Sequence, residues 1–287
     1  MYMVCRLSYK KKTMKKYIVI LMSVIALASC NDVQKNKRMI TVSIEPLRFF
    51  TEEIAGEKFK VTTMVPEGMS PETYEPTAQQ MMQLAESDAY IKVGEIGFEQ
   101  TWMKRMEANA PHTLVIDSSE GINPIKTANG ITDPHTWMSA RNALVIAQNI
   151  CEALIAIDNR DSAYFRARTE RLCERIQTTD LNVRKYITKE KSRAFLIYHP
   201  ILTYYARDYQ LKQIPIEEHG REPSSAQTAD IINHAKKDNA RVLFVQKQFN
   251  IKNTKAIASA VGAKTEEINP LSYNWCKEME RIARKLK

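Results

Sequence analysis

The stretch that decides the fold is DSAYFRARTERLCERIQTTDLNVRKYITK, residues 161–189. Its pattern is that of one long, charged helix of about eight turns at ~3.6 residues per turn. Asp161 and Ser162 are suitable N-terminal caps. The apolar positions do not sustain the heptads that a coiled-coil arm requires. We therefore predict a single helix that acts as a strut between two lobes.

On the N-terminal side of this helix, short apolar runs alternate with amphipathic segments. The expected strands are Met39–Ile44, Phe59–Val65, Ala89–Val93 and Thr113–Asp117. The expected helices are Leu47–Ala55, Thr77–Glu86, Phe98–Ala108 and Ser139–Ile157, with a Pro/Gly-rich loop at Pro66–Pro76. This alternation is typical of parallel βαβ units and predicts an α/β lobe.

The alternation resumes on the C-terminal side. Strands are expected at Ala194–Tyr198, Gln213–Ile216, Arg241–Gln246 and Lys264–Ile268. Helices are expected at Leu202–Asp208, Ser225–Asp238, Lys252–Val261 and Tyr273–Leu286. The predicted fold class is α/β, with two βα lobes bridged by one long rigid helix and a cleft between the lobes. The predicted divisions are a signal peptide (1–29), a tether (30–38), an N-terminal lobe (39–158), the linking helix (159–190) and a C-terminal lobe (191–287).

The formal net charge of +9 is concentrated at the N-terminus. Residues 1–29 hold six basic residues and no acidic residue, so 36 basic residues face 33 acidic residues in the remainder. This near balance removes the argument for a nucleic-acid partner. The hydrophobic fraction of 44% is too high for a disordered chain.

Residues 1–29 have the features of a lipoprotein signal peptide. Lys10–Lys16 is cationic, and the apolar run Tyr17–Leu27 is far shorter than the ~20 residues that span a bilayer. The sequence LASC at 27–30 resembles a bacterial lipobox, in which the chain is cut before Cys30 and its thiol is lipidated. Met14 is an alternative start. No other run approaches the length of a membrane span, so we expect a lipid-tethered protein on the extracytoplasmic or periplasmic face of the bacterial envelope.

Several common kinds of site lack their sequence signals. No GxGxxG, GxxxxGK[ST], HExxH or GxSxG motif occurs. After processing, Cys151, Cys173 and Cys276 remain, an odd number without a CxxC pair, which indicates neither a zinc knuckle nor a disulfide framework. Cys151 and Cys173 lie in helical patterns and are expected to be buried apolar residues.

Two of the five histidines stand where ligands are expected. His135 lies in the loop before the helix Ser139–Ile157, and His199 follows a predicted strand, where open α/β folds bind ligands. Neutral imidazoles from the two lobes could meet on one metal ion. His112 and His234 are expected at the surface or the edge of the core, so spacing alone leaves the pair His135 and His199 as a candidate site.

A series of motifs adds to this reading. In chain order they are SIEPL (43–47), VPEGMSPETYEP (65–76), DPHTW (133–137), YH (198–199), YYA (204–206), EPS (222–224) and NPL (269–271). Their order and spacing from Ile40 to Leu286 resemble the metal-binding subunits of zinc and manganese ABC importers. The resemblance implies two α/β lobes, a rigid bridging helix and a metal ion in the interlobe cleft. It also implies two partners, a membrane permease and its cytoplasmic ATPase.

The resemblance places four metal ligands, which are Glu72, His135, His199 and Asn269. Zinc members of the family typically present three His and one Asp, and manganese members present two His and two carboxylates. Here Glu72 stands where the first His is usual, and Asn269 where the Asp is usual. One carboxylate and two imidazoles keep the charge of the zinc-type set. Such a set, with a water or an amide oxygen in fourth place, favours Zn²⁺ over Mn²⁺ or Fe²⁺.

The hypothesis from the sequence is therefore a monomeric, lipid-anchored protein that binds zinc for uptake and carries out no catalysis. Glu45, Glu75 and Glu222 are candidates for outer positions around the site or for transporter docking. Two rival readings are a zinc-dependent hydrolase, which would need a general base that no motif supplies, and a metal-binding adhesin or sensor with the same fold.

Overall fold

The computed structural model describes residues 38–127, 130–188, 192–217, 221–246 and 254–286. The predicted signal peptide, Cys30 and nearly all of the tether lie outside these described residues. The segment from Arg38 to Lys287 forms one compact unit.

The N-terminal part of this unit contains a sheet of four parallel strands in the order β2-β1-β3-β4. The strands are β1 (Arg38–Val42), β2 (Phe59–Thr63), β3 (Ala89–Lys92) and β4 (Leu114–Asp117). The associated helices are α2 (Glu45–Ala55), α3 (Ala78–Ala85), α4 (Gly97–Asn109) and α5 (Ala140–Ile157). Apolar β1 side chains such as Ile40 and Val42 are fully buried, as expected for a central parallel strand.

The C-terminal part repeats this topology, with parallel strands in the order β6-β5-β7-β8. The strands are β5 (Ala194–Ile197), β6 (Lys212–Pro215), β7 (Val242–Gln246) and β8 (Lys264–Ile268). The helices are α7 (Thr203–Tyr209), α8 (Ser225–Lys237), α9 (Thr254–Val261) and α10 (Trp275–Lys285). In both sheets the order reverses beside the first strand, which creates a crevice at the carboxyl ends of neighbouring strands.

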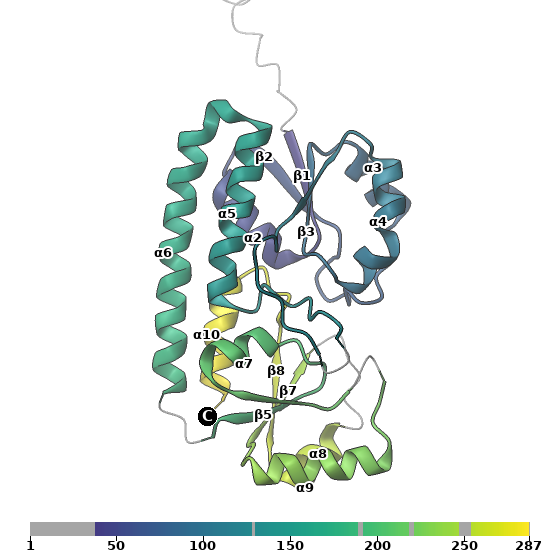
Figure 1. The fold of residues 1–287 in the computed structure, drawn as a ribbon, viewed down its shortest axis with the longest axis vertical. Coiled ribbons are helices and arrows are strands. Elements are labelled where there is room, and N and C mark those ends of the chain that lie inside the picture. Colours follow the sequence, from purple (N-terminus) through teal and green to yellow (C-terminus); the bar gives the residue numbers. More distant parts are fainter. Residues whose placement is uncertain (1–37, 128–129, 189–191, 218–220, 247–253, 287) are drawn as a thin grey trace, which may run out of the picture. The chain divides into compact units, whose positions relative to one another are not determined.

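The long helix α6 (Ser162–Ile187) joins the two parts. Its buried residues follow helical spacing: Phe165, Thr169, Leu172, Ile176, Thr179, Val183 and Ile187. This face packs against α5 and α2 on the N-terminal side and α10 on the C-terminal side (Figure 1). The Arg168 Nε donates to the Glu53 carbonyl (2.7 Å), and the Asn182 amide donates to Glu280 Oε1 (2.8 Å). The predicted α/β class with one bridging helix is confirmed.

One described helix has the length and hydropathy of a membrane span, contrary to the expectation that no run beyond the signal would. This helix is α5, and half of its 18 residues are buried within the protein. Its residues Ile146, Ile150 and Leu154 are fully buried, and the helix packs against α6 and α2. The apolar content of α5 is therefore used in the core.

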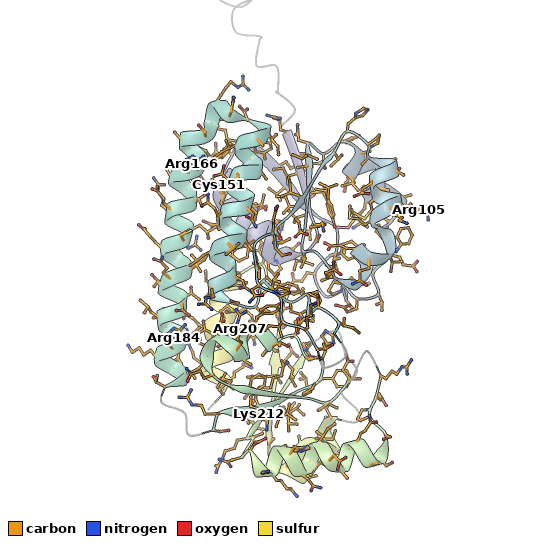
Figure 2. The ribbon with its side chains drawn as sticks, viewed as in Figure 1. Arg105, Cys151, Arg166, Arg184, Arg207 and Lys212 are labelled. Carbon is orange, nitrogen blue, oxygen red and sulfur yellow. The ribbon has the colours of Figure 1, made fainter. Side chains whose placement is uncertain are left out.

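The three described cysteines are free thiols. Cys151 on α5, labelled in Figure 2, is buried, as predicted, and burial raises the pKa of its thiol. Cys173 on α6 is only half-buried, so the expectation of a buried residue was wrong there. Cys276 is likewise half-buried, and no disulfide joins the described cysteines.

Candidate metal centre

Three of the four ligands expected from the sequence meet where the two α/β parts adjoin. Glu72 comes from the loop after β2, His135 from the loop before α5, and His199 from the end of β5. The Nε2 atoms of the two histidines are 3.2 Å apart, and Glu72 Oε1 is 3.9 Å from His135 Nε2. All three donor atoms lie within 4.8 Å of one another.

These separations fit a single cation between the three side chains. With zinc bonds of about 2.0–2.1 Å, two ligand atoms of a tetrahedral site lie about 3.3 Å apart. Glu72 Oε1 is buried and has no hydrogen-bond partner, although its side chain as a whole is 33% exposed. A buried carboxylate oxygen without a donor is costly, and a metal ion would satisfy it.

A buried carboxylate fixes the orientation of His135. Asp133 Oδ1 accepts hydrogen bonds from the backbone N–H of His135 (2.9 Å) and from its Nδ1 (2.8 Å), and Asp133 is only 7% exposed. Burial alone would raise the pKa of Asp133, but the hydrogen bonds that it accepts from His135 outweigh this effect, so the pKa lies below its usual value. The Tyr204 hydroxyl holds this turn by donating to the Asp133 carbonyl (2.8 Å).

A second buried carboxylate orients His199. Glu217, 4% exposed, accepts a hydrogen bond from His199 Nδ1 (2.7 Å). The Gln246 amide donates to the His199 carbonyl (2.8 Å). Because β6, β5 and β7 run parallel, their carboxyl ends bring these three side chains to one edge of the sheet.

The two carboxylates also set which nitrogen of each ring faces the site. An ionised carboxylate only accepts hydrogen bonds, so Nδ1 of each ring carries the proton and Nε2 presents a lone pair. Two lone pairs at 3.2 Å repel each other, and a cation between them removes this repulsion. The arrangement of His135 and His199 therefore suits metal binding better than a hydrogen bond between the rings.

Asn269 adjoins the His135 loop through the next residue in the chain. Its backbone N–H donates to Glu278 Oε1 (2.7 Å), and the carbonyl of the next residue, Pro270, accepts from the Trp137 indole (3.0 Å). Within the described residues, no hydrogen bond connects the Asn269 side chain with Glu72, His135 or His199.

The outer carboxylates of the site were not identified from the sequence. Asp133 and Glu217 hold the histidines, whereas the described contacts of Glu45 are with Arg48 (2.7 Å), and Glu75 and Glu222 are exposed. The available signals were the two-residue spacing of Asp133 from His135 and an acidic residue directly after the strand next to His199. His112 and His234 are exposed, as expected.

Another buried acid, Glu99 on α4, organises the N-terminal loops near Glu72. It accepts hydrogen bonds from the Ser43 hydroxyl and from the backbone N–H groups of Val93 and Gly94 (both 2.9 Å). Glu99 is 3% exposed, and burial raises its pKa to about 7 despite these hydrogen bonds. Because the Ser43 carbonyl accepts from the Val65 N–H (3.0 Å), this network supports the start of the Glu72 loop.

Two parallel α/β parts, one long connecting helix and donor atoms supplied by both parts define a metal-binding solute-binding protein. The family model described as "Zinc-uptake complex component A periplasmic" matches residues 40–287. The chain belongs to this family, which comprises the extracytoplasmic substrate-binding subunits of zinc ABC importers.

Individual relatives agree with this assignment. The high-affinity zinc uptake system protein ZnuA of Bacillus subtilis is 25% identical over 258 residues, covering 84% of this chain and 80% of that protein. The zinc-binding lipoprotein AdcA of Streptococcus pneumoniae is 24% identical over 287 residues, covering 90% of this chain and 56% of AdcA. A crystal structure of ZnuA superposes with a TM-score of 0.84 at 34% identity, covering 88% of this chain and 98% of that chain.

Proposed function

We propose that this chain captures Zn²⁺ outside the cytoplasm, with Glu72, His135 and His199 as ligands. The observation that carries the proposal is the buried, unpartnered Glu72 Oε1 beside the two Nε2 atoms. Zinc is the cargo of this site. The bound ion neutralises the carboxylate and separates the two imidazole lone pairs.

The donor set favours zinc over manganese. Two imidazoles and one carboxylate, completed by water, form a common tetrahedral zinc shell. Zinc also binds nitrogen ligands more strongly than manganese does, whereas manganese suits oxygen-rich shells. The fourth ligand is a water or the amide oxygen of Asn269, whose loop adjoins the His135 loop through Trp137 and Pro270. If Asn269 supplies the fourth ligand, the shell has a second oxygen ligand from the protein, and this supports manganese as the alternative cargo.

The position of the site indicates how the zinc ion enters it and is passed on to a transporter. Glu72 is partly exposed while both histidines are held from behind by buried carboxylates, so the Glu72 side is where the ion enters and leaves. The partners we propose are an ABC permease and its cytoplasmic ATPase. We also propose that lipidation at Cys30 keeps the protein at the membrane beside these partners.

We propose in addition that the chain divides into an N-terminal lobe at 39–158, a linking helix at 159–190 and a C-terminal lobe at 191–287.

The test is a competition titration of the purified protein with Zn²⁺ and Mn²⁺ at one fixed pH, since ligand protonation changes affinity. We expect one zinc ion per chain and an affinity for zinc at least ~100-fold above that for manganese, as the order of intrinsic affinities requires. Tighter binding of manganese than of zinc would contradict the proposal. Non-specific zinc binding alone, with many ions per chain and no single saturable site, would also contradict it.

A further inference from the structure

The first turn of α4 meets the loop that carries Glu72. The Phe98 N–H donates to the Pro71 carbonyl (3.0 Å), and Gly97 lies directly against Glu72. A Cβ atom on Gly97 would lie 2.4 Å from the Glu72 carbonyl oxygen and 2.9 Å from both its Cα and Oε2 atoms. Two of these three atoms belong to the backbone, so the overlap could be relieved only by moving the Glu72 loop and the first turn of α4 apart.

The backbone of Gly97 does not itself require glycine. Its φ is not in the left-handed region, unlike that of Gly94 (φ 99°) in the preceding turn. Glycine is also a weaker helix former than alanine at a helical position. Glycine is therefore required at position 97 for lack of a side chain, because this lets the Glu72 loop approach α4 closely.

We infer that Gly97 is a positioning residue that sets where Glu72 Oε1 stands in the zinc site. This inference rests on the proposed function. The carboxylate lies between Gly97, where an added Cβ would stand 2.9 Å from Oε2, and His135, whose Nε2 is 3.9 Å from Oε1. Restoring an ordinary contact of about 3.5 Å from a Cβ at residue 97 would displace the loop by about 1 Å. Metal–ligand distances tolerate only about ±0.2 Å, so this displacement takes Oε1 out of bonding range.

The experiment is a double-variant cycle in which the purified protein is titrated with Zn²⁺. Gly97→Ala is expected to lower zinc affinity about tenfold or more, close to the loss caused by Glu72→Gln. The double variant should bind no more weakly than Glu72→Gln alone, because the carboxylate is the only group through which Gly97 acts. The matched control is Gln100→Ala, an exposed change one turn further along α4, which should leave affinity unchanged.

Two further measurements separate positioning from general damage. The visible spectrum of the Co²⁺-loaded protein reports the ligand set, and Gly97→Ala should give the same altered spectrum as Glu72→Gln. Glu72→Asp keeps the charge but shortens the side chain by one methylene, so it should also lose affinity if the place of the oxygen is fixed. This second variant keeps the inference testable if Gly97→Ala folds poorly.

The possible failures are distinguishable. Wild-type zinc affinity in Gly97→Ala together with a loss in Glu72→Gln would overturn the inference and leave the proposed ligands standing. The inference would also be overturned, with the proposed ligands left standing, if the losses of zinc affinity from Gly97→Ala and Glu72→Gln added up in the double variant. Unchanged zinc affinity in Glu72→Asp would have the same consequence. Wild-type affinity in Glu72→Gln would overturn both the inference and the proposed role of Glu72.

Discussion

Replacing either His135 or His199 by alanine is expected to weaken zinc binding at least ~100-fold, equivalent to about 2.7 kcal/mol. Each residue supplies one of only two nitrogen donors among the described residues at the site. The loss should exceed the ~10–100-fold effects typical of residues that only support a metal ligand. Competition titration with a zinc chelator of known affinity measures the effect.

The control for this prediction is His112→Ala, because His112 is exposed and lies outside the three-residue group. Its zinc affinity should equal that of the unsubstituted protein. His199→Ala also leaves the buried Glu217 without its imidazole partner, so the thermal midpoint of each metal-free variant must be measured alongside. Unchanged zinc affinity in a folded alanine variant would exclude that histidine as a ligand.

The second large effect concerns the carboxylate. Glu72→Gln should cost more zinc affinity than Asn269→Ala, at least ~tenfold more, because it removes a charge as well as a good donor. Asn269→Ala should leave the local backbone in place, since the Asn269 contact with Glu278 is made by its main-chain N–H. Both variants are compared with the unsubstituted protein in zinc titrations at the same pH.

A gain-of-charge variant extends this comparison. Asn269→Asp should add a second carboxylate and shift the zinc-to-manganese preference toward manganese, which suits oxygen-rich shells. The double change Glu72→His with Asn269→Asp recreates a three-His, one-Asp set and should return the preference to zinc. If Asn269→Ala proves as damaging as Glu72→Gln, the amide is a true ligand and a shell of three protein ligands plus water is wrong.

The secondary structure was largely readable from the sequence because hydrophobic periodicity is local. Predicted elements differ from the observed ones mainly at their ends, as at β2, which stops at Thr63 rather than Val65. There the backbone N–H of Met64 and Val65 still bonds to the neighbouring β1 segment, but no longer as part of the strand. The strut α6 was recognisable from its length and charge, and its ends agree to within two residues.

The site was only partly readable. His135 and His199 stand out because histidines are few and both lie at loop or strand ends. Glu217 could not be matched to His199 from the sequence, because their contact depends on β6 lying beside β5. The close approach of Gly97 to Glu72 brings together the first turn of α4 and a loop 25 positions earlier in the chain, and nothing in either segment alone indicates it. Strand order and loop packing supply what local patterns lack.

The central claim is that one zinc ion binds between Glu72, His135 and His199. Anomalous diffraction from zinc-soaked crystals, recorded above and below the zinc absorption edge, tests it most directly. The account predicts one strong peak bonded to Glu72 Oε1 and to the Nε2 atoms of both histidines, at about 2.0–2.2 Å. A peak that contacts the two histidines but not Glu72, or one that lies elsewhere on the protein, would contradict it.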